Sequence, residues 1–175
     1  RTDFDLKAHE EFSGKKLHYF DPQENKSYVP YVVETSIGLD RMFLAVFSNS
    51  LQEEALENGT TRTVLKLPAV LAPYKAAILP LVKKDGLPEV ARQIMDDLKW
   101  DFNVFYDEKD AVGKRYRRQD AAGTPFCITI DHDTLDDNFV TIRHRDTMDQ
   151  KRVAISDLKE IIKKEVAIKT WLQKM

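Results

Sequence analysis

The run VVETSIGLDR contains four residues whose types and spacing could bind a small charged ligand: Glu34, Ser36, Gly38 and Arg41. Glu34 and Ser36 lie two residues apart at the end of an expected strand, so both side chains point to one face. Gly38 allows close backbone approach, and Arg41 lies just inside an expected helix. A helix N-terminus with a guanidinium favours a polyphosphate, and a carboxylate beside a hydroxyl suits a small ammonium group. A solvated arginine and a helix-capping serine are the simpler explanation of the same pattern.

A second cluster, in the run KRYRRQD, has the composition of an RNA-binding surface. Its members are four cations, one aromatic ring and one carboxylate: Lys114, Arg115, Tyr116, Arg117, Arg118 and Asp120. Cations bind phosphates, an aromatic ring stacks on an unstacked base, and a carboxylate accepts from the amino group of cytosine. Arg143 and Arg145 lie on a later expected strand and would extend this basic surface. A solvated helix face is the alternative, and composition alone favours it.

The charge of the chain is unevenly distributed, although the formal net charge is only −2. Residues 1–67 carry 8 Lys or Arg and 11 Asp or Glu, whereas residues 68–175 carry 19 and 18. Local clustering of cations matters more for RNA binding than the sum. No apolar run approaches the roughly 18 residues that a membrane-spanning helix needs, so we expect no membrane partner.

The single cysteine, Cys127, lies in the apolar run PFCITI and is expected to be a buried, unreactive thiol. A chain without a possible internal disulfide fits a reducing compartment, so we expect a cytoplasmic location. The histidines lack metal-finger spacing. His132 lies among several aspartates, which we interpret as a solvated loop because no calcium-loop pattern accompanies them, so no metal site is expected.

Periodicity and turn residues predict an α/β fold with a mixed β-sheet flanked by helices. Expected strands lie at residues 29–35, 71–79, 102–106, 125–130 and 139–144. Expected helices lie at residues 38–51, 87–98 and 112–122 and after Ser156, which could cap the last helix. Residues 52–63 are polar, contain Asn58-Gly59 and are expected to form a surface connection. We therefore predict a strand–helix piece at 1–51, a linker at 52–67 and a second domain at 68–175.

The longer run YVPYVVETSIGLDRMFLAVF, preceded by RTDFDLKAHEEFSGKKLHYFD, resembles motif 3 of the class II aminoacyl-tRNA synthetases and, in particular, glycyl-tRNA synthetase. The family pattern V-x-E-x-S-x-G-x-x-R is matched by Glu34, Ser36, Gly38 and Arg41. The resemblance implies that Glu34 and Ser36 belong to a glycine pocket. It also implies that Arg41, at the Gly38 junction, contacts the phosphates of ATP, and that Arg1 lies near the carboxylate of glycine.

The second cluster also resembles this family, in its anticodon-binding domain. The pattern G-x-R-Y-x-R-x-D-x-x-G-x-P-F is matched at every fixed position: Gly113, Arg115, Tyr116, Arg118, Asp120, Gly123, Pro125 and Phe126. Glycine tRNAs carry two cytosines in the anticodon. The resemblance therefore implies anticodon-binding residues on this surface, which we assign as Arg115, Tyr116, Arg118, Asp120, Arg143 and Arg145.

By this resemblance the parent protein is a glycine–tRNA ligase, which charges glycine tRNA with ATP and Mg²⁺. The chain begins with Arg1 and lacks the family's motifs 1 and 2, so we expect a fragment that binds tRNA, is inactive alone and holds neither ATP nor Mg²⁺. The apolar face with Met42, Phe43, Val46 and Phe47 must pack on the second domain, pair with another copy of the chain or be poorly ordered, and of these we expect a homodimer. The alternative is an accessory tRNA-binding protein without aminoacylation. A nucleotide- or redox-binding domain is disfavoured because no glycine-rich phosphate loop follows a strand.

Overall fold

The computed structural model describes residues 2–56 and 59–173, and its chain divides into two compact units, residues 1–42 and 43–175. The first unit begins with helix α1 (Phe4–Ser13), which ends at Gly14 in the left-handed conformation (φ 67°). The amide of Gly14 donates to the carbonyl of Glu10 and so closes the last turn. Strands β1 (Tyr19–Asp21) and β2 (Lys26–Tyr28) then form a small antiparallel hairpin. Helix α1 was not among the helices predicted from the sequence.

The segment that carries Glu34, Ser36 and Gly38 has no regular structure. Residues 29–38 are neither helix nor strand, so the predicted strand at 29–35 is wrong for this structure. A strand needs a neighbour for its backbone groups, and no described strand pairs with this segment. Helix α2 (Leu39–Ser50) follows and confirms the helix expected at 38–51.

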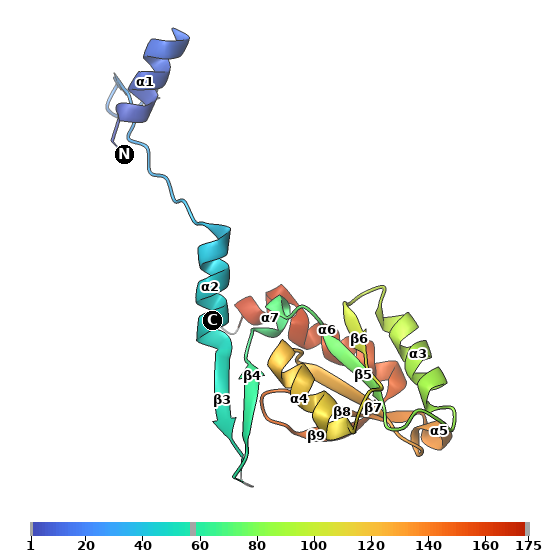
Figure 1. Cartoon of the computed structure of the whole chain (residues 1–175). Coiled ribbons are helices and arrows are strands. Elements are labelled where there is room, and N and C mark those ends of the chain that lie inside the picture. The colour runs from blue at the N-terminus through green and yellow to red at the C-terminus, as the bar shows by residue number, and fades with distance from the viewer. Residues whose placement is uncertain (1, 57–58, 174–175) are drawn as a thin grey trace. The chain divides into compact units, whose positions relative to one another are not determined.

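A five-stranded mixed sheet forms the centre of the second unit (Figure 1). Its order is β6 (Val104–Tyr106), β5 (Ala76–Pro80), β7 (Phe126–Ile130), β8 (Phe139–His144) and β9 (Gln150–Ala154). β5 runs parallel to both β6 and β7, whereas β7–β8 and β8–β9 are antiparallel. The predicted α/β fold with a mixed sheet is therefore confirmed, and β9 is the strand that the sequence analysis missed.

Helices cover both faces of this sheet. The chain steps from β5 to β6 through α3 (Leu87–Leu98) and returns past β5 to β7 through α4 (Val112–Ala122). Right-handed crossovers in opposite directions place these helices on opposite faces. The α3 face also receives α6 (Leu158–Val166) and forms the larger apolar cluster, with Ile78, Ile128 and Ile162 fully buried. The α4 face has only a small apolar cluster around Ala77, Leu79 and Cys127.

Short elements complete the unit. They are the 3-10 turns η1 (Ala69–Leu71) and η2 (Ile155–Asp157), α5 (Thr134–Asp137) and α7 (Ile168–Leu172). Ser156 lies within η2, its hydroxyl contacts the Asp157 carboxylate, and Asp157 is the N-cap residue of α6 without a side-chain cap hydrogen bond. The expected Ser156 cap is therefore wrong, because the 3-10 turn moves the N-cap position by one residue, to Asp157.

The polar connection expected at residues 52–63 is a β-hairpin in the structure. β3 (Leu51–Ala55) follows α2 without a break and pairs antiparallel with β4 (Thr61–Leu65). β4 lies against the C-terminal end of α4, which stops at Gly123 (φ 81°). A Cβ atom on Gly123 would lie 3.2 Å from the carbonyl oxygen of Leu65, so this glycine permits both the left-handed turn and the close approach.

A candidate RNA-binding surface on helix α4

Helix α4 separates its residues into a buried polar side and an exposed basic side. It begins after Ala111, in the extended conformation, and ends at Gly123, which confirms the helix predicted at 112–122. Three polar residues face the sheet and are at most 4% exposed: Arg115, Gln119 and Asp120. The residues that face outward and line a shallow depression are Gly113, Lys114, Arg117 and Arg118.

Arg115 ties α4 to the ends of two strands. Its side chain is 1% exposed, and Nη1 donates to the carbonyl oxygens of Pro80 (2.7 Å) and Asp107 (3.0 Å). Nη2 donates to the carbonyl oxygen of Leu81 at 3.2 Å. Burial lowers the pKa of Arg115, with the nearby Asp107 carboxylate opposing the shift. The guanidinium is therefore hydrogen-bonded within the fold, at the point where β5 and β6 end.

Asp120 is the centre of a buried ionic cluster. Arg143 donates to it through both terminal nitrogens, at 2.8 Å and 3.0 Å, and Arg62 donates to it at 3.0 Å. All three side chains are at most 6% exposed. Burial acts to lower the pKa of Arg143, but the hydrogen bonds and the charge of Asp120, together with smaller contributions from Cys127 and Tyr116, raise the pKa above its usual value. The carboxylate is therefore fully engaged by two cations within the domain.

Arg145 and Tyr116 also make internal contacts. Arg145 is 3% exposed and donates to the carbonyl oxygens of Gly123 and Leu67, both at 2.8 Å. The hydroxyl of Tyr116 lies 2.6 Å from Oγ1 of Thr129, and its ring lies 4.9 Å from the Arg143 guanidinium. Burial raises the pKa of Tyr116.

The exposed side of α4 continues into a hollow with aromatic and ionic walls. Arg118, 42% exposed, pairs with Asp107 at 2.7 Å and with Asp110 at 2.9 Å. Beside this pair, the half-exposed ring of Tyr74 lies 5.1 Å from the ring of Phe105. The residues that line this hollow are Tyr74, Phe105, Asp107, Lys109, Asp110, Arg118, Gln119 and Ala122. Tyr74 and Phe105 were missed because they are far apart in the sequence and neither belongs to a motif.

The six residues predicted to contact an anticodon therefore divide into two groups. Arg115, Asp120, Arg143 and Arg145 are buried and bonded within the chain, whereas Arg118 is exposed and Tyr116 is partly buried. Direct contact of any of the six with RNA stays a prediction. The local sequence could not distinguish these four buried residues from exposed ones, because their partners lie elsewhere in the chain.

The residues predicted to bind glycine and ATP are exposed and are not brought together. Glu34 and Ser36 lie in the irregular segment, and among the described residues neither is hydrogen-bonded to Arg41. The stem of Arg41 lies over Gly38, with Cγ and Cδ 4.0 Å from the position of an added Cβ. Arg1 lies outside the described residues.

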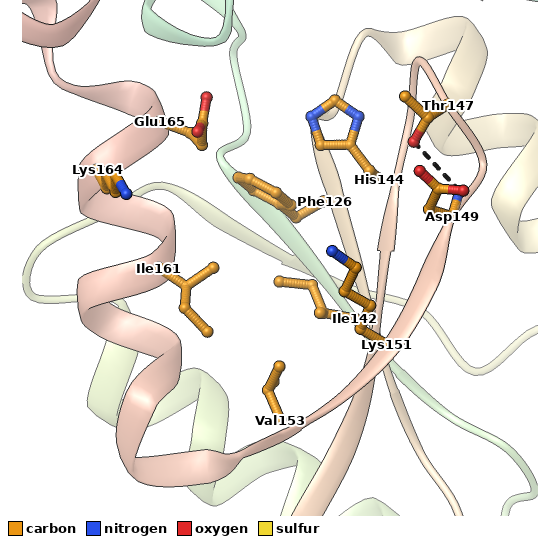
Figure 2. A pocket seen from close by; sticks show the side chains of 10 residues that line it. All are labelled: Phe126, Ile142, His144, Thr147, Asp149, Lys151, Val153, Ile161, Lys164 and Glu165. Carbon is orange, nitrogen blue, oxygen red and sulfur yellow. Dashed lines mark hydrogen bonds between the residues drawn. The ribbon is translucent and has the colours of Figure 1, made fainter.

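A second hollow lies on the opposite face of the sheet, between α6 and strands β7 to β9 (Figure 2). Its apolar wall consists of Phe126, Ile142, Val153 and Ile161. Polar side chains surround this wall: His144, Thr147, Asp149, Lys151, Lys164 and Glu165. Cations and carboxylates are mixed here, so this hollow lacks the single-sign basic character of the α4 surface.

The described parts of the chain contain neither a metal-binding cluster nor a membrane-spanning helix. No group of three or more His, Cys, Asp or Glu side chains could hold a metal ion there. Within residues 2–56 and 59–173, no helix is long and apolar enough to cross a membrane. His132 instead lies 3.1 Å from the Asp85 carboxylate. Cys127 is 1% exposed, as expected, and burial raises the pKa of its thiol to about 12.

The sheet order, the helices on both faces and the basic α4 place the second unit in the class of α/β nucleic-acid-binding domains. Residues 75–165 match the family described as "Anticodon binding domain", and the chain belongs to this family. The RNA-binding domain of threonyl-tRNA synthetase from Cryptosporidium parvum Iowa II shares the fold, with a TM-score of 0.52 and 24% identity. That match covers 57% of this chain and 25% of the other.

Closer relatives are glycine–tRNA ligases. Those of Geobacillus thermodenitrificans and Clostridium tetani are 53% identical over 167 and 166 residues, and that of Bacillus anthracis is 54% identical over 166 residues. Each match covers 95% of this chain and 35–36% of the relative. The resemblance to glycyl-tRNA synthetase is thus confirmed, and the chain spans about a third of the length of the curated relatives that it matches.

Proposed function

We propose that this chain recognises the anticodon of glycine tRNA as part of a glycine–tRNA ligase. The observation that carries the proposal is the agreement between the family match, residues 75–165, and the exposed basic side of α4 within it. Lys114, Arg117 and Arg118 supply cations for phosphates, whose contacts provide most of the affinity in such complexes.

The hollow beside α4 supplies the chemistry that a cytosine requires. The exposed ring of Tyr74 offers a stacking surface for an unstacked base. Asp107 can accept from the amino group of cytosine, and Arg118 can donate to its ring nitrogen and carbonyl oxygen. In this proposal Arg115, Asp120, Arg143 and Arg145 are positioning residues that hold α4 and the strand ends in place.

The charging reaction itself belongs to the proposed parent enzyme. There, the helix start at Gly38 and the exposed guanidinium of Arg41 would meet the phosphates of ATP with its Mg²⁺, and Glu34 and Ser36 would meet the ammonium group of glycine. Arg1 would lie near the carboxylate of glycine. Glu34, Ser36, Gly38 and Arg41 are exposed here, and we propose that the 175-residue chain alone forms no glycyl-adenylate. ATP–pyrophosphate exchange by the isolated chain would contradict this.

The proposed ligase acts in the cytoplasm as a homodimer. The exposed apolar side chains of α2 support an interface, since Phe43 and Phe47 stack at 5.9 Å with 68% and 37% of their surface exposed. Sedimentation of the full-length protein tests this, and a monomer at micromolar concentration would overturn it.

Filter binding tests anticodon recognition directly. The chain is expected to bind glycine tRNA at least about tenfold more tightly than the same tRNA with a swapped anticodon, because each mismatched base contact costs about 1–3 kcal/mol. Arg118→Ala should abolish the difference. Lys164→Ala, on the opposite face of the sheet, is the matched control and should preserve it. Equal binding of both tRNAs by the unmodified chain would favour the accessory-protein alternative.

A further inference from the structure

Arg62 joins the β3–β4 hairpin to two other parts of the second unit. It is 2% exposed, although both of its neighbours on β4, Thr61 and Thr63, are exposed. Nη1 donates to Asp120 on α4 (3.0 Å) and to the carbonyl oxygen of Arg145 (2.9 Å), just past the end of β8. Nε donates to Glu54 on the paired strand at 2.7 Å. One guanidinium thus fixes the hairpin to both α4 and the sheet.

One contact of Arg62 leads toward the proposed anticodon surface. Asp120 is shared between Arg62 and Arg143, and the Arg143 guanidinium lies against the ring of Tyr116. A movement of Tyr116 or α4 on RNA binding would therefore change how Asp120 is shared between the two arginines.

The hairpin also leads directly to helix α2. α2 ends at Ser50 and β3 begins at Leu51, so no linker separates them. Ser50 is 5% exposed, and its carbonyl oxygen accepts from the amide of Lys66 at 2.7 Å, just beyond β4. The C-terminal end of α2 is therefore hydrogen-bonded into the hairpin that Arg62 holds, and the first turn of α2 carries Arg41.

We propose that Arg62 is a positioning residue that couples anticodon binding at α4 to helix α2, so that a tRNA with the correct anticodon is charged faster. The proposal rests on the ligase function proposed above. Arg62 contacts neither RNA nor substrate in this role. It transmits a change at Asp120 to the hairpin, and the hairpin transmits it to the helix that bears Arg41.

The Arg62→Gln variant tests the proposal because it leaves no buried charge without a partner. Asp120 keeps its two hydrogen bonds from Arg143, and Glu54 keeps its ion pair with Lys66. The α4 surface should therefore stay folded while the connection to the hairpin is lost. Thr63→Ala, an exposed change on the same strand, is the matched control.

The experiment uses the full-length ligase and compares glycine tRNA with its anticodon-swapped version. For Arg62→Gln we expect unchanged ATP–pyrophosphate exchange without tRNA, and a ratio of kcat/KM for the two tRNAs that falls by about tenfold, the usual range of coupling between sites. A ratio equal to that of the unmodified enzyme would overturn the proposal, whether or not the overall rate falls, because a structural defect lowers both rates alike.

Two further measurements keep the outcomes separate. If Arg62→Gln does not fold, Arg62→Lys retains a cation near Asp120 but cannot reproduce the fork of contacts, and its ratio decides in the same way. A failure of the proposed function is distinct, because the unmodified enzyme would then show no difference between the two tRNAs. A normal difference in the unmodified enzyme with an unaltered ratio in both variants overturns only the role of Arg62.

Discussion

The two faces of the central sheet are built with different chemistry. On the α3 and α6 face, buried isoleucine and leucine side chains such as Ile128 and Ile162 form an apolar layer. On the α4 face, a small apolar cluster lies beside buried arginines and a carboxylate centred on Asp120. Apolar burial is non-directional and tolerates small changes of shape, whereas buried ionic groups require defined partners and geometry. The apolar face thus supplies stability, and the ionic face fixes the position of α4.

The largest difference between the faces should follow from Asp120→Ala. This change leaves Arg62 and Arg143 buried without their shared carboxylate, and breaking a buried pair in this way costs about 3–5 kcal/mol. Urea denaturation measures the loss of unfolding free energy. Asp136→Ala, an exposed carboxylate, serves as the control and should change it little. A loss below about 1 kcal/mol for Asp120→Ala would mean that the cluster is hydrated, and the comparison would fail.

A small apolar change on the opposite face should cost less. Ile128→Val removes one buried methylene from a residue with no exposed surface, which typically costs about 0.5–1.5 kcal/mol. The same denaturation experiment measures it. Binding of glycine tRNA should be unchanged at temperatures where the variant is folded, because α4 lies on the other face. An altered anticodon preference would show that the two faces are not independent.

Low pH should reduce the stability that the α4 face contributes, because Asp107 becomes protonated. Burial acts to raise the pKa of Asp107, but the Arg118 guanidinium, the amide of Lys109 and the charge of Arg115 together hold the pKa below its usual value. A depressed carboxyl pKa contributes stability above the ordinary pKa near about 4, and this contribution is lost as the pH falls through the folded-state value. Asp107→Asn should therefore be less sensitive to pH between about 4 and 2 than the unmodified chain. Because Arg118 is 42% exposed, the difference should stay below about 1 kcal/mol. The prediction would be refuted if the unfolding free energies of the two proteins changed identically over this range of pH.

The smallest expected effect is a difference between exposed and buried cations in the salt dependence of tRNA binding. Lys114→Ala should lower the slope of log affinity against log salt by about one phosphate contact. Arg115→Lys should leave that slope unchanged, because Arg115 is 1% exposed and bonded to backbone carbonyls. A reduced slope for Arg115→Lys would instead support the direct RNA contact predicted from the sequence.

The difference between local and long-range contacts explains which elements the sequence could predict. Local patterns predicted α4, β7 and β8, because a helix-ending glycine and apolar runs between turns determine such elements nearby in the chain. The hairpin β3–β4 and strand β9 were missed because polar residues predominate in both. Each of these strands pairs with its neighbour along the chain, and β4 is also held by Arg62, whose hydrogen bond to Asp120 joins residues 58 positions apart.

The candidate site shows the same limit more sharply. The motif identified the correct helix, but an arginine looks the same in a sequence whether it binds solvent or a buried carboxylate. Arg115 and Asp120 were therefore predicted to be binding residues, whereas the structure shows that both are buried. Tyr74 and Phe105, in contrast, line the exposed hollow but were not predicted, because their rings meet only when β5 and β6 are neighbours.

The position of Cys127 provides a built-in measure of motion in this domain. It is the only cysteine in the chain, and it lies on the α4 face of β7 in contact with the small apolar cluster. A thiol with a pKa near 12 and almost no exposed surface reacts only when its cover opens. The rate of its modification by a thiol reagent therefore reports how often α4 separates from the sheet, without any label being introduced.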